Sequence, residues 1–124
     1  MHFFSLLTAA GTAALALAAP STDKTKRASK LKFFGVNESG PEFGTANIPG
    51  VYNTDYTWLN LSTIDTFIAK SMNTFRINIL MERLVPNSLT GALDKNYMGN
   101  LTQDVNYITS KGAYAIICPH NYGR

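Results

Sequence analysis

Hydrophobic and polar positions follow two periods along the chain, and the shorter period predicts β-strands. In TFRINIL, residues 74–80, apolar side chains alternate with Arg76 and Asn78, so the two polar side chains share one face of an extended segment. Short apolar runs at residues 32–37 and 113–118 border polar or glycine-containing clusters, which is typical of buried strands. The pattern therefore predicts three strands.

The longer period is helical and falls between these strands. Ser62 offers a helix N-cap with Asp65 three residues later, and the apolar spacing that follows predicts a helix over residues 63–71. A loop over residues 82–97 then leads into a second predicted helix, which ends near Gly112. The apolar stripe of this second helix consists of Met98, Leu101, Val105 and Ile108.

The order strand, helix, strand, helix, strand, without a hairpin turn, predicts a parallel sheet built from βαβ units. A doubly wound nucleotide-binding sheet is disfavoured, because NESGPEFG after the first strand lacks the glycine-rich fingerprint. A (β/α)8 TIM barrel fits better, because polar residues follow the strand ends, where barrel enzymes build their sites. Such barrels take roughly 250 residues, so we expect an α/β fold with only the first three strands and two helices present, in an incomplete domain over residues 28–124.

The N-terminal residues read as targeting sequence. Residues 1–18 combine an apolar run with the small-x-small ending that signal peptidase recognises, and a membrane anchor is the weaker alternative because no stop-transfer charge cluster follows. Residues 19–27 end in a dibasic pair and form either a pro-segment or a solvated linker. We expect a secreted, extracellular protein that has no membrane association after cleavage.

Charge and metal-ligand spacing exclude several kinds of partner. Residues 28–124 hold eight basic and seven acidic residues, so no basic cluster points to nucleic acid. His120 is the one histidine outside the predicted signal, and no metal-binding spacing surrounds it, so we expect neither a metal nor another cofactor. The single cysteine, Cys118, is either a small buried hydrophobe or the partner of a cysteine outside this sequence.

Three N-glycosylation sequons fit a secretory route. They begin at Asn37, Asn60 and Asn100. Asn60 is the strongest candidate for occupancy because it lies in a polar loop beside a predicted helix start, and Asn100 is the second.

The sequence does not decide the roles of the titratable residues near the strand ends. Glu38, Glu42 and Glu82 each follow a strand, yet solvated loop glutamates are common. His120 can donate to sugar hydroxyls or transfer a proton, or it can be a structural histidine bonded to a carbonyl. Arg76, inside a barrel, requires a carboxylate partner, which can be structural or catalytic.

Three motifs resemble fungal endo-β-1,4-glucanases of glycoside hydrolase family 5, over about residues 31–124. The motifs are FFGVNESGPEFG, NTFRINILMERLVPNSLTG and GAYAIICPHNYGR. The resemblance implies a secreted cellulase with a (β/α)8 domain that cuts internal β-1,4 bonds of cellulose with retention, without a cofactor, and as a monomer when complete. In this family Arg76 would orient the nucleophile carboxylate. The residues that would bind substrate are His120, Asn121, Tyr122, Asn37 and Glu38.

Departures from the family pattern limit what can be transferred. The family's acid/base and nucleophile glutamates follow later strands, so no glutamate here takes either role, and the chain alone is expected to be inactive. Cys118 stands where similar enzymes often carry an aspartate. The alternatives are a non-catalytic secreted carbohydrate-binding relic, and a β-mannanase or β-1,3-glucanase of the same family.

Overall fold

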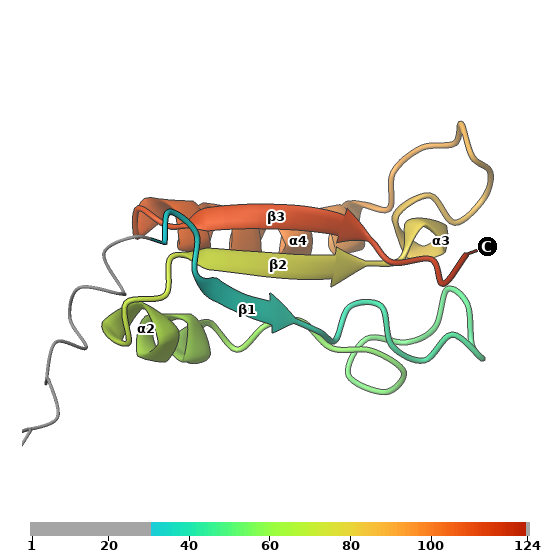
Figure 1. The fold of residues 1–124 in the computed structure, drawn as a ribbon. Coiled ribbons are helices and arrows are strands. Elements are labelled where there is room, and N and C mark those ends of the chain that lie inside the picture. The colour runs from blue at the N-terminus through green and yellow to red at the C-terminus, as the bar shows by residue number, and fades with distance from the viewer. Residues whose placement is uncertain (1–30, 124) are drawn as a thin grey trace, which may run out of the picture. The chain divides into compact units, whose positions relative to one another are not determined.

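The computed structural model describes residues 31–123, which form a three-stranded parallel sheet with helices against one face (Figure 1). The predicted signal at residues 1–18 and the predicted pro-segment or linker at residues 19–27 lie outside the described residues. The strands lie in the order β1-β2-β3, and both pairs are parallel, as the sequence predicted. In chain order, the elements are β1 (Gly35–Glu38), α2 (Leu61–Ala69), β2 (Thr74–Ile79), α3 (Met81–Leu84), α4 (Lys95–Ser110) and β3 (Tyr114–Pro119).

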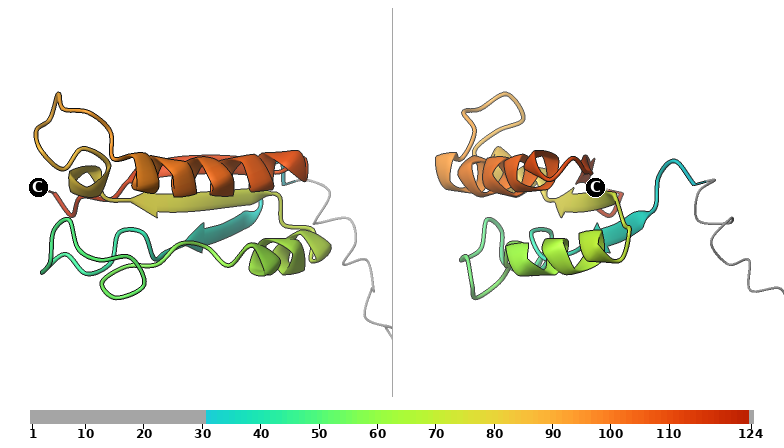
Figure 2. Two further views of the ribbon diagram at one scale, coloured as in Figure 1. Left: turned by 180° about the vertical axis from the view of Figure 1, so that it is seen from behind. Right: turned by 90° about the vertical axis from the view of Figure 1, so that its left-hand side faces the viewer.

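The hydrophobic core lies between the sheet and the two longer helices. Alternation along β2 buries Phe75, Ile77 and Ile79 on the helix side, where they pack with Ile64 of α2 and Ile108 of α4. Figure 2 shows both helices behind the same face of the sheet. The predicted alternation is confirmed, and it directs the polar side chains of β2 to the other face.

Helix α2 begins earlier than predicted. The expected helix was 63–71 with Ser62 as its N-cap, but Asn60 is the N-cap, and its Oδ1 accepts hydrogen bonds from the Ser62 backbone N at 3.1 Å and the Ser62 hydroxyl at 2.8 Å. Asparagine and serine are similarly good N-caps, so sequence alone did not separate them. The predicted capping box is wrong.

The predicted apolar stripe of α4 is confirmed at Leu101, Val105 and Ile108, which lie in or against the core, but not at its first residue. Met98 is 38% exposed, and its place in the buried stripe is taken by Tyr97, which is 1% exposed. The Tyr97 hydroxyl accepts from the backbone N of Leu80 and donates to the backbone O of Pro41, each at 3.0 Å, and burial raises the Tyr97 pKa to about 12. These two bonds satisfy a buried phenol that hydropathy alone would assign to the surface.

Element boundaries differ in two further places. The predicted loop over residues 82–97 overlaps helix α3, which begins at Met81, and the first three residues of α4, so the described part of the chain has three helices instead of two. The predicted strand at residues 32–37 begins only at Gly35, because the Asn73 side chain engages the chain before it, accepting from Phe34 N at 2.9 Å and donating to Lys32 O at 3.0 Å.

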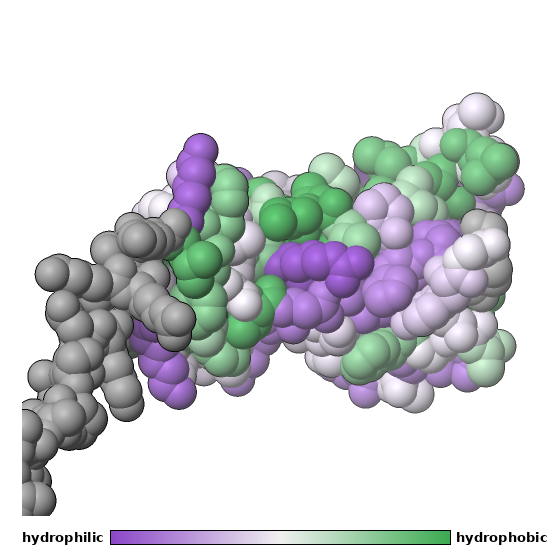
Figure 3. Space-filling view, viewed as in Figure 1, coloured by the Kyte–Doolittle hydropathy of each residue, from purple (hydrophilic) through white to green (hydrophobic). Residues whose placement is uncertain are grey.

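The face of the sheet away from the helices is uncovered. Tyr114 and Ile116 of β3 are about half exposed there, and Figure 3 shows hydrophilic residues beside hydrophobic patches over this side. A sheet that leaves one apolar face open is what three strands of a closed barrel present. Among the helices of residues 31–123, none has the length and apolar character needed to cross a bilayer.

Candidate functional site

The open face of the sheet carries Arg76 at its centre. The register pairs Arg76 of β2 with Asn37 of β1, and the Arg76 Nη1 donates to the Asn37 Oδ1 at 2.5 Å. The Arg76 Nη2 donates to the Sγ of Cys118 on β3 at 2.7 Å. Neither contact is a carboxylate, so in the described part of the chain the guanidinium is positioned by neutral side-chain groups of both neighbouring strands.

Glu42, in the loop after β1, is buried at 1% exposure. Its Oε2 accepts from the backbone N of Gly40 at 2.7 Å, and its Oε1 accepts from the Asn78 Nδ2 at 2.9 Å. The Nδ1 of His120 lies 4.0 Å from the Glu42 Oε1. Sequence reasoning treated Glu42 as one of three equivalent loop glutamates, because nothing in the irregular spacing of that loop indicates which carboxylate folds back onto β2.

His120 and the two residues after it form the end of the described chain. The His120 backbone N donates to the Ile79 O at 2.8 Å, and its ring stacks on Tyr122 with centroids 4.6 Å apart. Asn121 turns toward α3, where its Oδ1 accepts from Met81 N at 3.2 Å and its Nδ2 donates to the Glu82 Oε2 at 2.6 Å. Tyr122 is 55% exposed, so a ring face remains accessible beside the imidazole.

Glu38 is the predicted site residue that the structure does not bring to this surface. It pairs with Ile77 in the register and therefore points to the helix side of β1, and burial raises the pKa of its carboxyl. There it faces Asp104 of α4, which is 3% exposed and whose pKa rises to about 6, mainly by burial and also through the nearby Glu38 charge. Both carboxyls therefore lie on the side of the sheet that the helices cover, and not on the open face.

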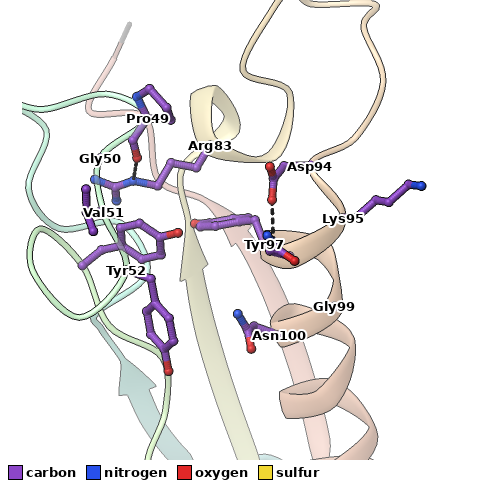
Figure 4. Close-up of a pocket in the computed structure, with 12 residues that line it drawn as sticks. Pro49, Gly50, Val51, Tyr52, Arg83, Asp94, Lys95, Tyr97, Gly99 and Asn100 are labelled. Carbon is purple, nitrogen blue, oxygen red and sulfur yellow. Dashed lines mark hydrogen bonds between the residues drawn. The ribbon is translucent and has the colours of Figure 1, made fainter.

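The loop that carries Glu42 is held by a second buried charge, Arg83 of α3, at 2% exposure. Its Nε and Nη1 donate to the backbone oxygens of Pro49 and Pro41, each at 2.7 Å, and its Nη2 donates to that of Gly44 at 3.1 Å. The guanidinium also lies 4.2 Å from the ring centre of Tyr56, and Figure 4 shows it reaching across to Pro49. Sequence reasoning missed this residue, since it placed Arg83 in a loop, where charged side chains are usually exposed.

The three sequon asparagines occupy different environments. Asn37 lies beside Arg76 on the open face of the sheet, and its Nδ2 donates to the Ser39 hydroxyl at 2.7 Å. Asn60 is exposed and caps α2. Asn100 is half-buried on α4 and lines a pocket away from the strand tips.

The strand-tip surface has the groups needed to hold a neutral polyhydroxylated ligand. It combines the amide of Asn37, the charge of Arg76, and the stacked rings of His120 and Tyr122, while the fully buried Asn78 holds Glu42 beside them. Sugar hydroxyls are recognised by such polar groups, while aromatic faces cover the apolar side of a ring. Asn37 lies in the carboxyl-terminal half of β1, and His120 and Tyr122 follow β3, at the end of the strands where barrel enzymes place their sites, whereas Arg76 lies in the first half of β2.

Comparison with known proteins agrees with this geometry. The family profile described as Cellulase (glycosyl hydrolase family 5) matches residues 36–124. Endo-beta-1,4-glucanase B of Aspergillus niger is 54% identical over 125 residues, which cover all of this chain and 38% of that protein. Endoglucanase gh5-1 of Neurospora crassa is 50% identical over 95 residues, which cover 77% of this chain and 24% of that protein. The chain thus spans little more than a third of the length of the first relative and about a quarter of the length of the second.

Solved structures give the same result for the fold. The endo-beta-1,4-glucanase Xac0029 from Xanthomonas axonopodis pv. citri superposes with a TM-score of 0.71 at 38% identity, over 76% of this chain and 29% of that one. XacCel5A, solved in complex with cellopentaose, superposes with a TM-score of 0.65 at 36% identity, over 68% of this chain and 27% of that one. The three strands are therefore part of a (β/α)8 barrel, and the chain belongs to the cellulases of glycosyl hydrolase family 5.

Proposed function

We propose that the full-length gene product is a secreted, retaining endo-β-1,4-glucanase that hydrolyses internal bonds of cellulose, and that the strand-tip surface of this chain is one wall of its cleft. The family and the names of the relatives support the reaction class. The bound cellopentaose of XacCel5A supports a β-1,4-glucan as the ligand. The enzyme requires no cofactor and acts as a monomer.

One observation supports the role that we assign to these residues, namely that the charge of Arg76 has no carboxylate partner within residues 31–123. A guanidinium keeps its charge at any pH a protein tolerates, and inside a barrel it needs a carboxylate to be well compensated. Its contacts within residues 31–123 are an amide oxygen and a sulfur atom, which fix its direction without matching its charge. The guanidinium is thus oriented to receive a carboxylate from a later part of the barrel, and we assign that carboxylate to the nucleophile.

The remaining tip residues bind the sugar. His120 and Tyr122 present a stacked imidazole and phenol at the end of β3, which suits a pyranose with one apolar face and several hydroxyls. Asn37 and Asn121 border the surface: Asn37 orients Arg76, and Asn121 anchors the segment after β3 to α3. Glu38 has no part in substrate contact, because its side chain faces the helices.

Retaining hydrolysis needs an acid/base and a nucleophile about 5 Å apart. By the family pattern, both glutamates follow later strands, so residues 28–124 bind and orient but do not cleave. We expect the isolated segment to release no reducing ends from carboxymethylcellulose, and measurable release would refute this assignment.

The reaction itself is tested by following cellopentaose cleavage by the full-length gene product with proton NMR. The expected first product carries the β-anomer, which later mutarotates. Initial appearance of the α-anomer would overturn the retaining mechanism, and cleavage of β-1,4-mannan or β-1,3-glucan in place of cellulose would overturn the substrate.

A further inference from the structure

A pocket of about 710 Å³ lies between the loop at residues 49–56 and the first turns of α4 (Figure 4). Its volume falls within the range of about 300–1,000 Å³ that is usual for small-ligand pockets. Its lining shares no residue with the row of Asn37, Arg76 and His120 at the strand tips. The pocket is therefore separate from the residues assigned to glucan binding.

One wall of this pocket is aromatic. The ring centres of Tyr52 and Tyr56 are 5.8 Å apart, and those of Tyr56 and Tyr97 are 5.7 Å apart. Arg83 lies over Tyr56 at 4.2 Å and binds the Pro49 carbonyl, which fixes the wall in place. Tyr52 remains 46% exposed, so this wall presents aromatic surface that nothing in the described chain covers.

The opposite wall carries a sequon. Asn100-Leu101-Thr102 lies in the second turn of α4, and Figure 4 shows the Asn100 side chain on the side of the helix that faces the tyrosines. Within residues 31–123 the Asn100 amide makes no hydrogen bond, whereas Asn37 donates to Ser39 and Asn60 caps α2. A sugar bonded to Asn100 would start inside the pocket, whereas one bonded to the exposed Asn60 would start in solvent.

We propose that Asn100 is N-glycosylated and that the first N-acetylglucosamine of its glycan is seated in this pocket, with one face of the ring against Tyr52. The donor is a lipid-diphosphate-linked oligosaccharide of the secretory route. The Asn100 Nδ2 forms the new bond to C1 of the sugar, the bond from C1 to the lipid diphosphate breaks, and one amide proton leaves to solvent. The proposal rests on the secretory part of the proposed function and is independent of hydrolysis.

The pocket offers both kinds of contact that N-acetylglucosamine can make. The C–H face of a pyranose packs on an aromatic face, and the hydroxyls and the acetamido group remain for polar partners such as Asp94 and Lys95 on the rim. Covering Tyr52 removes apolar surface from water, which stabilises the glycosylated fold. The glycan would also restrain the loop between β1 and α2, which contains both Tyr52 and Glu42.

The test uses the full-length gene product secreted from a fungal host and trimmed enzymatically to a single sugar per site. Peptide mapping is expected to find the sugar on Asn100 in the unsubstituted protein and in Thr102→Ser, which keeps the sequon, and not in Asn100→Gln. The trimmed protein is expected to melt about 2 °C or more above Asn100→Gln. This difference should persist in a Tyr52→Phe background and disappear in a Tyr52→Ala background.

Each contrary outcome has a separate meaning. Secreted protein with unmodified Asn100 contradicts this proposal alone. An occupied Asn100 whose effect on melting is equal with and without the Tyr52 ring contradicts the seat in the pocket. Protein retained inside the cell contradicts the secretory route and the modification together, while cellulose hydrolysis by the same preparation is scored independently.

Discussion

Replacing Arg83 by methionine removes the charge that holds the loop after β1 while keeping a side chain of similar length. Three hydrogen bonds from a charged donor would be worth about 5–9 kcal/mol if each counted fully. Much of this gross value is offset, because a buried guanidinium also loses its hydration.

The net cost depends on which carbonyls lose their last partner. The Pro41 oxygen still accepts from the Tyr97 hydroxyl, and the Gly44 oxygen still accepts from Asn47 N at 3.1 Å. The Pro49 oxygen has no second partner among the bonds of the described chain, but Pro49 is exposed, so water can replace the lost donor and the loss costs about 0.5–1.5 kcal/mol. With the lost contact to Tyr56, worth about 1 kcal/mol, we expect Arg83→Met to lower the free energy of unfolding by about 2 kcal/mol.

The assay is urea denaturation of the full-length gene product, combined with limited proteolysis over residues 44–57. Arg83→Met should unfold at lower urea concentration, and the loop should be cut faster in the native state. Lys95→Met is the matched control, because Lys95 is exposed on α4 and its loss should change stability by about 0.5 kcal/mol or less. If Arg83→Met were as stable as this control, the buried guanidinium would not be what fixes the loop.

Three further predictions concern single side chains. The Asp104 carboxyl has a folded pKa of about 6, above its ordinary value of 3.8, so the folded state binds more protons than the unfolded state between these pH values and stability falls as pH rises through them. Asp104→Asn should therefore be more stable than the unsubstituted protein by about 1–3 kcal/mol at pH 7 and no more stable at pH 3. Denaturant titrations that find equal stability of the two proteins at both pH values would contradict this. Glu42→Gln should cost about 1–3 kcal/mol, because the Gly40 N–H and the Asn78 amide lose a charged acceptor, and it should raise KM for cellopentaose; an unchanged KM would separate Glu42 from the cleft. Arg76→Ala should lower kcat of the full-length gene product more than it raises KM, because the guanidinium serves the nucleophile, and steady-state kinetics with unchanged kcat would reject that role.

The regular elements could be predicted from sequence because their side-chain periods are strong. The alternation in TFRINIL placed Arg76 and Asn78 on the open face correctly, and the parallel order of the strands followed from the absence of hairpin turns. The stripe of α4 was predicted correctly at Leu101, Val105 and Ile108 but not at its start, where Tyr97 replaces Met98, because Tyr97 is buried through two hydrogen bonds that hydropathy does not register.

The loop after β1 could not be predicted, and it holds the residues that sequence reasoning missed. Its shape depends on Arg83, some forty residues further along the chain, which binds three of its carbonyls. Its buried carboxylate, Glu42, is selected by a long-range bond to Asn78. Such contacts between distant segments leave no periodic trace in the sequence, so Glu42 and the exposed loop carboxylates look alike there.

The most direct test of the central claim is hydrolysis of carboxymethylcellulose by the full-length gene product, with viscosity and reducing ends recorded in the same reaction. Internal cleavage at a cleft formed partly by Arg76, His120 and Tyr122 predicts that viscosity falls well before reducing ends accumulate, and that Arg76→Ala greatly slows both. A folded full-length product that leaves carboxymethylcellulose intact, or that cleaves it as fast without Arg76, would contradict the account.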